Sequence, residues 1–194
     1  MPRRWLPALL LLAPGAALAH SPMPGIGYFY GGILHPALVP SHLVALVALG
    51  LLVGQRGLTA MRLAYPCFLL ALVAGLILAG FSPEAPTSAE TVLLVLAGCC
   101  GLAVASQLTA HHALLALATL LTAFVIGADS GVADLDRRET FGAMLGAGVG
   151  ACILFIAVAG LAEMPRRDWQ RILIRVLGSW CAASAALVLA LALR

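Results

Sequence analysis

Residues 31–46 read GGILHPALVPSHLVAL, an apolar stretch that contains two histidines and two prolines. The apolar side chains continue on both sides, so that the segment 26–54 is long enough to cross a bilayer, which needs about 20 residues. A proline inside a helix removes a backbone donor and clashes with the preceding turn. We therefore expect a first membrane span over 26–54 that is kinked at Pro36 and Pro40.

Five more apolar segments of similar length follow the first span. They cover residues 63–81, 91–108, 111–128, 141–162 and 172–193. The chain of 194 residues is 62% apolar and only 10% charged, whereas a soluble domain has roughly 25% charged residues. This composition excludes a soluble enzyme, a disordered chain and a nucleic-acid-binding module. The expected fold is an all-α integral membrane protein with six transmembrane helices in a single domain, 20–194.

Residues 1–19 have the pattern of a cleavable signal peptide. Arg3 and Arg4 precede an apolar run that ends in small residues, so we expect cleavage after Ala19. An uncleaved first helix is the alternative. Cleavage would make His20 the first mature residue, and its α-amine and imidazole could together chelate a metal ion. The other interpretation of His20 is a solvated terminal residue without a role.

The arginines predict the orientation of the chain in the bacterial inner membrane, because arginine is enriched in cytoplasmic loops. With the mature N-terminus on the periplasmic side, more arginines fall on the cytoplasmic side than on the periplasmic side. The cytoplasmic arginines are Arg56, Arg62, Arg166, Arg167, Arg171 and Arg175, and the periplasmic ones are Arg137, Arg138 and Arg194. Both mature termini are therefore expected on the periplasmic side of a multi-pass membrane protein.

Glycines on the fifth span predict close helix packing. Gly142, Gly146 and Gly150 repeat at a spacing of four, with Gly148 between them. Such a face lets two helices approach closely in lipid. The pattern fits packing within one chain and packing between copies equally well, so that a homo-oligomer through 141–162 is one of its two interpretations.

His35 and His42 are candidate metal ligands, because ionisable residues inside a membrane span are costly and usually functional. On a regular helix they would share a face but lie about 10.5 Å apart along the axis. That separation is too large for both to bind one ion at bond lengths near 2 Å. Either the proline break folds the two imidazoles together, or they mark successive steps of a path. The structural alternative is a pair of neutral histidines that are hydrogen-bonded to neighbouring helices.

Asp129 lies at the outer end of the fourth predicted span, where it could complete a metal site with His35 and His20. A solvated loop carboxylate is the alternative interpretation. His111 and His112 lie at the other end of that span and point in different directions on a helix, so we interpret them as interfacial. The five cysteines all fall within predicted spans and are interpreted as small buried apolar residues.

Four features of the chain resemble the HupE/UreJ family of hydrogenase- and urease-accessory membrane proteins. They are the histidine after Ala19, the motifs at 31–36 and 42–46, the six-span layout and the last helix around 175–180. Two departures accompany the resemblance. Val39 and Ser41 stand where the first-span signature has Gly and Asp, and residues 126–134 keep the glycines of the second motif without its two histidines.

The resemblance implies a permease that takes a divalent transition metal from the periplasmic side past the histidines of the first span. It implies nickel or cobalt, although imidazole also suits copper and zinc. The ion would be the substrate, and we expect no tightly bound cofactor. The alternative is a non-transporting accessory or assembly partner of a metalloenzyme. We expect no enzyme activity, because the sequence has no nucleophile–base pair and no paired intramembrane carboxylates.

A reporter enzyme fused after Arg194 tests the expected orientation. We expect it to lie in the periplasm, because a removed signal peptide followed by six crossings returns the chain to its starting side. Alkaline phosphatase activity in whole cells measures the location, and a fusion after Arg166 serves as the cytoplasmic control. A cytoplasmic result for the first fusion would mean that a span is miscounted or that the signal peptide is retained.

Overall fold

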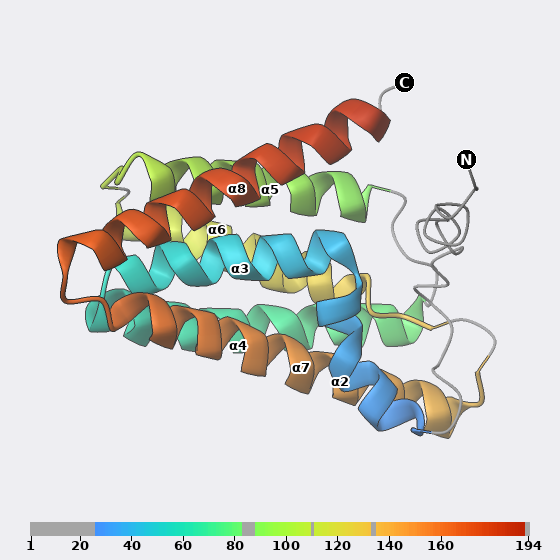
Figure 1. Cartoon of the computed structure of the whole chain (residues 1–194). Helices are drawn as coiled ribbons and strands as arrows, with labels where there is room; N and C mark the ends of the chain where they lie inside the picture. The colour runs from blue at the N-terminus through green and yellow to red at the C-terminus, as the bar shows by residue number, and fades with distance from the viewer. Residues whose placement is uncertain (1–25, 83–87, 110, 133–134, 193–194) are drawn as a thin grey trace, which may run out of the picture.

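The computed structural model describes residues 26–82, 88–109, 111–132 and 135–192. Within these residues the chain forms seven α-helices and no strand (Figure 1). The helices are α2 (Tyr28–Leu38), α3 (Pro40–Gln55), α4 (Leu58–Phe81), α5 (Ala89–Ala105), α6 (His112–Ala128), α7 (Arg137–Glu163) and α8 (Asp168–Ala192). The predicted all-α architecture is confirmed. The expected signal peptide and His20 lie outside the described residues.

Each predicted span corresponds to one helix, except that the first corresponds to the pair α2 and α3. The helix ends differ from the prediction by up to five residues. For example, α7 begins at Arg137 and not at 141, because the carboxylate of Asp136 accepts a hydrogen bond from the Arg137 backbone N–H and caps the helix. Polar residues thus extend the helix beyond the apolar run from which the span was predicted.

Three helices, α4, α7 and α8, are long and apolar enough to cross a membrane. The α2–α3 pair meets the same criterion as one bent span. The helices α5 and α6 are also apolar, but each has 17 residues, which is at the lower limit for a span. The chain is therefore a multi-pass membrane protein, whereas the full set of six crossings stays a prediction.

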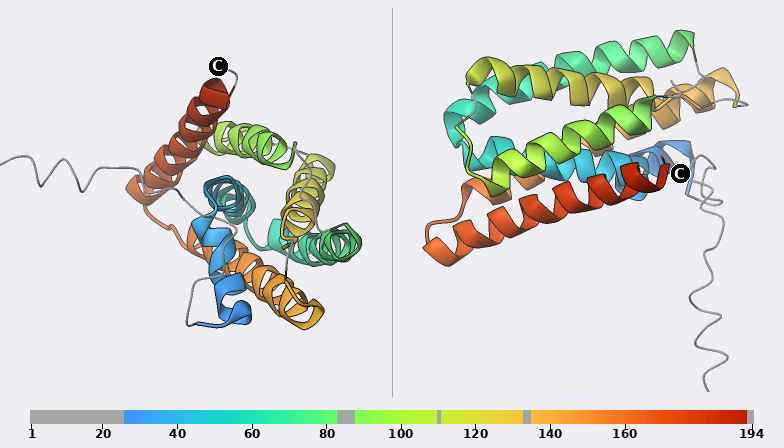
Figure 2. Two further views of the ribbon diagram at one scale, coloured as in Figure 1. Left: turned by 90° about the vertical axis from the view of Figure 1, so that its right-hand side faces the viewer. Right: turned by 90° about the horizontal axis from the view of Figure 1, so that it is seen from above.

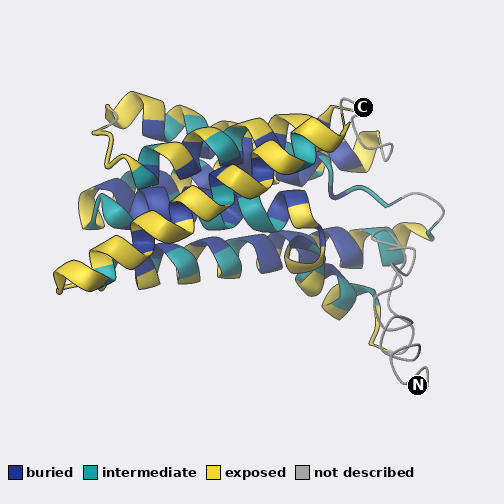
Figure 3. Ribbon diagram, turned by 45° about the horizontal axis from the view of Figure 1, so that its top comes forward, coloured by how far each residue is buried: buried dark blue, intermediate teal, exposed yellow. Residues whose placement is uncertain are grey.

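Helix α3 lies in the middle of the bundle, with α5, α7 and α8 packed against it (Figure 2). Its side chains are apolar all the way from Leu43 to Gly54, and most of them are buried. A helix that is apolar on every side is stable only when other helices or lipid surround it. The outer helices instead have many exposed residues (Figure 3). Exposed apolar side chains include Leu70 of α4 and Trp180 of α8.

The first span is broken at Val39. A residue that precedes proline is disfavoured in the helical conformation, and Val39 before Pro40 is extended, with φ −85° and ψ 113°. Pro36, in contrast, lies inside α2 without ending it. The axes of α2 and α3 consequently meet at an angle of 69°. The predicted kink is confirmed, and its main cause is Pro40.

The bend lays α2 against the first half of α7, where glycines allow the two backbones to touch. A methyl group added at Gly146 would overlap the carbonyl of Phe29, and one at Gly150 would overlap that of Ile33. Gly142 faces open space among the described residues. The glycine pattern of 141–162 is thus used for packing within the chain, and a homo-oligomer through this segment stays an untested prediction.

Gly146→Ala should lower the free energy of unfolding by about 1–3 kcal/mol, because the added methyl group overlaps the backbone of α2. Gly142→Ala is the matched control on the same helix. It should be neutral or stabilising by up to about 1 kcal/mol, since alanine favours a helix over glycine. Unfolding of the purified protein in detergent, followed by circular dichroism, measures both effects. Equal effects of the two substitutions would contradict the contact.

Candidate functional site

The two ends of the bundle differ in their chemistry. We call the end where α2 meets α3 the bend end; the last turn of α6 and the first turn of α7 also lie there. The opposite end, which we call the arginine end, carries Arg56, Arg166 and Arg171. Helix α2 begins and α8 ends at the bend end (Figure 1). Six crossings bring the end of α8 back to the side on which α2 begins, and both do lie at the same end of the bundle. Which end faces the cytoplasm stays a prediction.

The break at Val39 brings the two imidazoles of the first span together. The ring centroids of His35 and His42 lie 5.4 Å apart, and the ring planes cross at 81°. On a straight helix the two residues would be separated by about 10.5 Å along the axis. The observed geometry is thus the first of the two sequence-based alternatives, in which the proline break folds the imidazoles together.

Asp129, the residue that follows the last turn of α6, reaches the same place. Its Oδ2 lies 2.8 Å from Nε2 of His42, although the two residues are 87 positions apart in the chain. The side chain of His42 is fully buried, and that of Asp129 is only 13% exposed. The interpretation of Asp129 as a solvated loop carboxylate is therefore wrong, because packing of α6 beside α3 shields the carboxylate and pairs it with an imidazole.

The hydrogen bond to Asp129 defines what the other nitrogen of His42 can do. In the neutral imidazole, the nitrogen that faces a carboxylate carries the proton, so Nε2 donates and Nδ1 keeps its lone pair. Nδ1 is buried and has no hydrogen-bond partner among the residues that the structure describes. Histidines that bind metals usually donate their second ring N–H to a carboxylate or carbonyl in this way. The arrangement thus leaves Nδ1 able to accept a hydrogen bond or bind a metal ion.

The charges at the bend end favour a cation. The C-terminal end of a helix carries a partial negative charge, and α6 ends directly at the Asp129 carboxylate. The start of α7 lies at the same end and adds no net charge, because Asp136 and Glu139 are matched there by Arg137 and Arg138. The Asp129 carboxylate, the end of α6 and the imidazole lone pair therefore favour the same kind of ligand, a positively charged metal ion.

Three of the four predicted site residues come together, and we call His35, His42 and Asp129 the bend-end site. Within the described ranges, no three His, Cys, Asp or Glu side chains are placed to hold a metal ion jointly. Asp129 is occupied with His42, so the site offers two imidazoles and one orienting carboxylate. His20, the fourth predicted metal ligand, lies outside the described residues.

The remaining histidines lie at the arginine end, away from the bend-end site. His111 is the N-cap of α6, and its Nδ1 accepts a hydrogen bond from the Ala113 backbone N–H at 3.2 Å. His111 and His112 are both exposed. Their geometry fits the interfacial interpretation, and it makes them suitable controls for the histidines of the first span.

Two buried serines adjoin the site and were not selected from the sequence. Ser41 is 5% exposed and Ser130 is 3% exposed. The hydroxyl of Ser130 donates a hydrogen bond to the carbonyl of Ile126 at 2.6 Å, which satisfies the last turn of α6. Their positions in the sequence could have identified them, because Ser41 directly precedes His42 and Ser130 directly follows Asp129.

A double-mutant cycle on His42 and Asp129 tests their pairing. Asp129→Ala leaves the buried Nε2–H of His42 without its acceptor, which should cost about 1–3 kcal/mol of stability. In the His42→Ala background, Asp129→Ala should lower the stability by about 1 kcal/mol less, or by a still smaller amount, because the imidazole that pairs with Asp129 is already absent. Thermal unfolding of the four purified proteins measures the coupling. Additive effects would show that the hydrogen bond is not formed.

A family model described as HupE / UreJ protein matches residues 8–189, which is nearly the entire sequence. The matched region includes the bent first span and the end of α6, and therefore both segments of the bend-end site. No curated protein and no solved structure matches the chain.

Proposed function

Because the chain belongs to the HupE/UreJ family, whose members are membrane proteins with transport or accessory roles for nickel or cobalt, we propose that it is a permease for a divalent transition metal. Members of this family are not enzymes. In our proposal, the ion enters from the periplasmic side at the bend end. Nickel and cobalt are the expected substrates because of the family, and imidazole ligands suit both.

One observation carries the proposal: a buried imidazole that Asp129 orients and whose second nitrogen is unpaired among the described residues. His42 is held at Nε2 by the carboxylate at 2.8 Å, and Nδ1 is left for a ligand. His35 is the second imidazole, with its ring centroid 5.4 Å away. Asp129 orients His42 and contributes negative charge, and such partner carboxylates typically change metal affinity by about 10–100-fold.

We propose that His20 supplies further nitrogen ligands. Two imidazoles and water would hold a passing ion weakly, whereas the α-amine and imidazole of a mature His20 would add a chelate. The eight residues from His20 to Gly27 could extend over up to roughly 26 Å, which exceeds the length of about 16 Å expected for the 11-residue helix α2. The length of this segment therefore does not limit access to His35.

The distribution of charge supports entry at the bend end. Carboxylates adjoin the histidines there, whereas arginines predominate at the opposite end. A cation is attracted by the first surface and repelled by the second. This asymmetry also agrees with the predicted orientation, in which the arginine end faces the cytoplasm.

Metal uptake by cells that express the protein tests the proposal. The double variant His35→Ala/His42→Ala should lose nickel and cobalt uptake by about tenfold or more, because both imidazoles of the bend-end site are removed. The matched control is His111→Ala/His112→Ala, which removes two exposed histidines and should leave uptake unchanged. The amount of each variant in the membrane is measured in parallel. Uptake that persists in the first double variant at normal protein levels would contradict a role of these histidines.

A non-transporting accessory role is the second candidate, and a specific observation favours it. Residues 126–134 lack the two histidines that the second motif of the family contains, and the described residues hold no three-ligand cluster. A protein of this kind would co-purify with a metalloenzyme or its assembly proteins. Purified protein in sealed vesicles separates the two functions, since only a permease would produce metal flux.

A further inference from the structure

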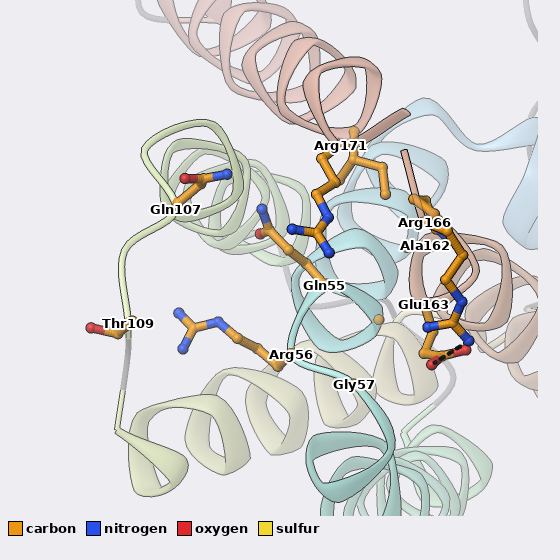
Figure 4. A pocket seen from close by; sticks show the side chains of 12 residues that line it. Gln55, Arg56, Gly57, Gln107, Thr109, Ala162, Glu163, Arg166 and Arg171 are labelled. Atoms are coloured by element: carbon orange, nitrogen blue, oxygen red, sulfur yellow. Dashed lines mark ion pairs between the residues drawn. The ribbon is translucent and has the colours of Figure 1, made fainter. Parts of the chain in front are cut away.

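A polar pocket opens at the arginine end of the bundle, at the opposite end of α3 from His42. It has a volume of about 420 Å³ and lies where the ends of α3, α5 and α7 meet the start of α8 (Figure 4). Its polar lining residues are Gln55, Arg56, Gln107, Thr109, Glu163, Arg166 and Arg171. Helix α3 separates the pocket from the bend-end site, and the two sites share no lining residue.

The pocket has an excess of positive charge. Three arginines and one glutamate line it, which leaves a net charge of +2. Glu163 and Arg166 form an ion pair at 3.9 Å, and Arg56 and Arg171 are the other two arginines of the lining. Figure 4 shows Arg171 pointing toward Gln55, while Arg56 extends toward the segment that carries Thr109. The two guanidinium groups therefore come from different parts of the chain, Arg56 from the turn after α3 and Arg171 from the first turns of α8.

The hydrogen-bonding groups of the pocket define its ligand more closely. Guanidinium groups bind phosphate oxygens through paired N–H donors. Gln55 adds an acceptor, because its Nε2 donates to the Val104 carbonyl at 3.4 Å while Oε1 is buried without a hydrogen-bond partner among the described residues. The first turn of α4, which follows Gly57 in the pocket wall, has no side-chain cap and favours a nearby anion.

We infer that this pocket binds a phosphate group that carries a hydroxylated substituent. The arginines would hold the phosphate, and Oε1 of Gln55 would accept a hydrogen bond from the hydroxyl group. The headgroup of an anionic phospholipid such as phosphatidylglycerol has this chemistry, and the pocket lies at the helix ends of a membrane protein, where headgroups are found. Basic pockets between membrane helices on the cytoplasmic side, where the predicted orientation places this end, bind the headgroups of other anionic lipids. A soluble phosphate compound is the other source of the same chemistry.

Native mass spectrometry of the purified full-length protein, with phosphatidylglycerol and phosphatidylcholine added in equal amounts, tests the inference. The wild-type protein should retain phosphatidylglycerol preferentially, and Arg56→Gln/Arg171→Gln should reduce that retention by roughly tenfold or more. Arg62→Gln/Arg167→Gln is the matched control, because it removes two arginines from the same end that do not line the pocket. Equal loss in both double variants would overturn the inference in favour of diffuse surface charge.

Two further arms make the result decisive. Inorganic phosphate, added at constant ionic strength, should displace the lipid if a phosphate group is what the pocket recognises. Stabilisation by phosphate without any lipid preference would instead identify a soluble ligand, and the absence of both effects would overturn the inference. If the double variant unfolds, Arg171→Gln alone, which alters an exposed side chain, should still lower retention, whereas Arg171→Lys should preserve part of it.

Discussion

Pro40 disfavours the helical conformation at the residue before it, and much of the bend end depends on this constraint. Val39 becomes extended, and α2 leaves the axis of α3 at 69°. The turn folds His35 back beside His42 and lays α2 across α7. Pro40 itself is well placed at the start of α3, where a backbone N–H would have no partner within the helix.

The pairing of His42 with Asp129 is the second relation on which the bend end depends. A buried imidazole and a largely buried carboxylate are both costly in an apolar bundle, and the contact at 2.8 Å offsets much of that cost. The same contact fixes the orientation of the ring, so that Nδ1 and not Nε2 is left available. The shape of the first span and the chemistry of its histidine are thus linked through a residue from α6.

Local patterns in the sequence predicted the fold better than the site. Apolar runs located every helix, Pro36 and Pro40 located the kink, and Gly146 and Gly150 indicated a close helix contact. The helix ends were predicted less well, because residues such as Arg137 continue a helix beyond the apolar run when Asp136 caps it. The direction of the bend was not predictable, since it depends on how α2 packs against α7.

The site required tertiary information. His35, His42 and Asp129 were recognisable as unusual residues, but nothing in the sequence indicates that Asp129 pairs with His42, 87 positions away. The arginine-lined pocket was not predicted at all. Arg56 follows α3 and Arg171 lies in α8, far apart in the chain. In the sequence, the count of arginines indicates only the orientation in the membrane and does not reveal a pocket.

The apolar surface of α3 has a consequence for kinetics. Between His42 and Gln55 this helix carries no polar side chain, and the buried polar side chains elsewhere in the described interior are only Thr119 and Thr122 of α6, apart from the two serines beside the bend-end site. This stretch is about 18 Å long at the standard helical rise. Moving even a monovalent ion from water into so dry a medium costs on the order of 20 kcal/mol. In the proposed permease, an ion that moved along α3 would therefore cross this stretch only when helices separate, which is the behaviour of a carrier. Its flux would saturate with ion concentration and rise steeply with temperature, unlike the flux through a water-filled channel.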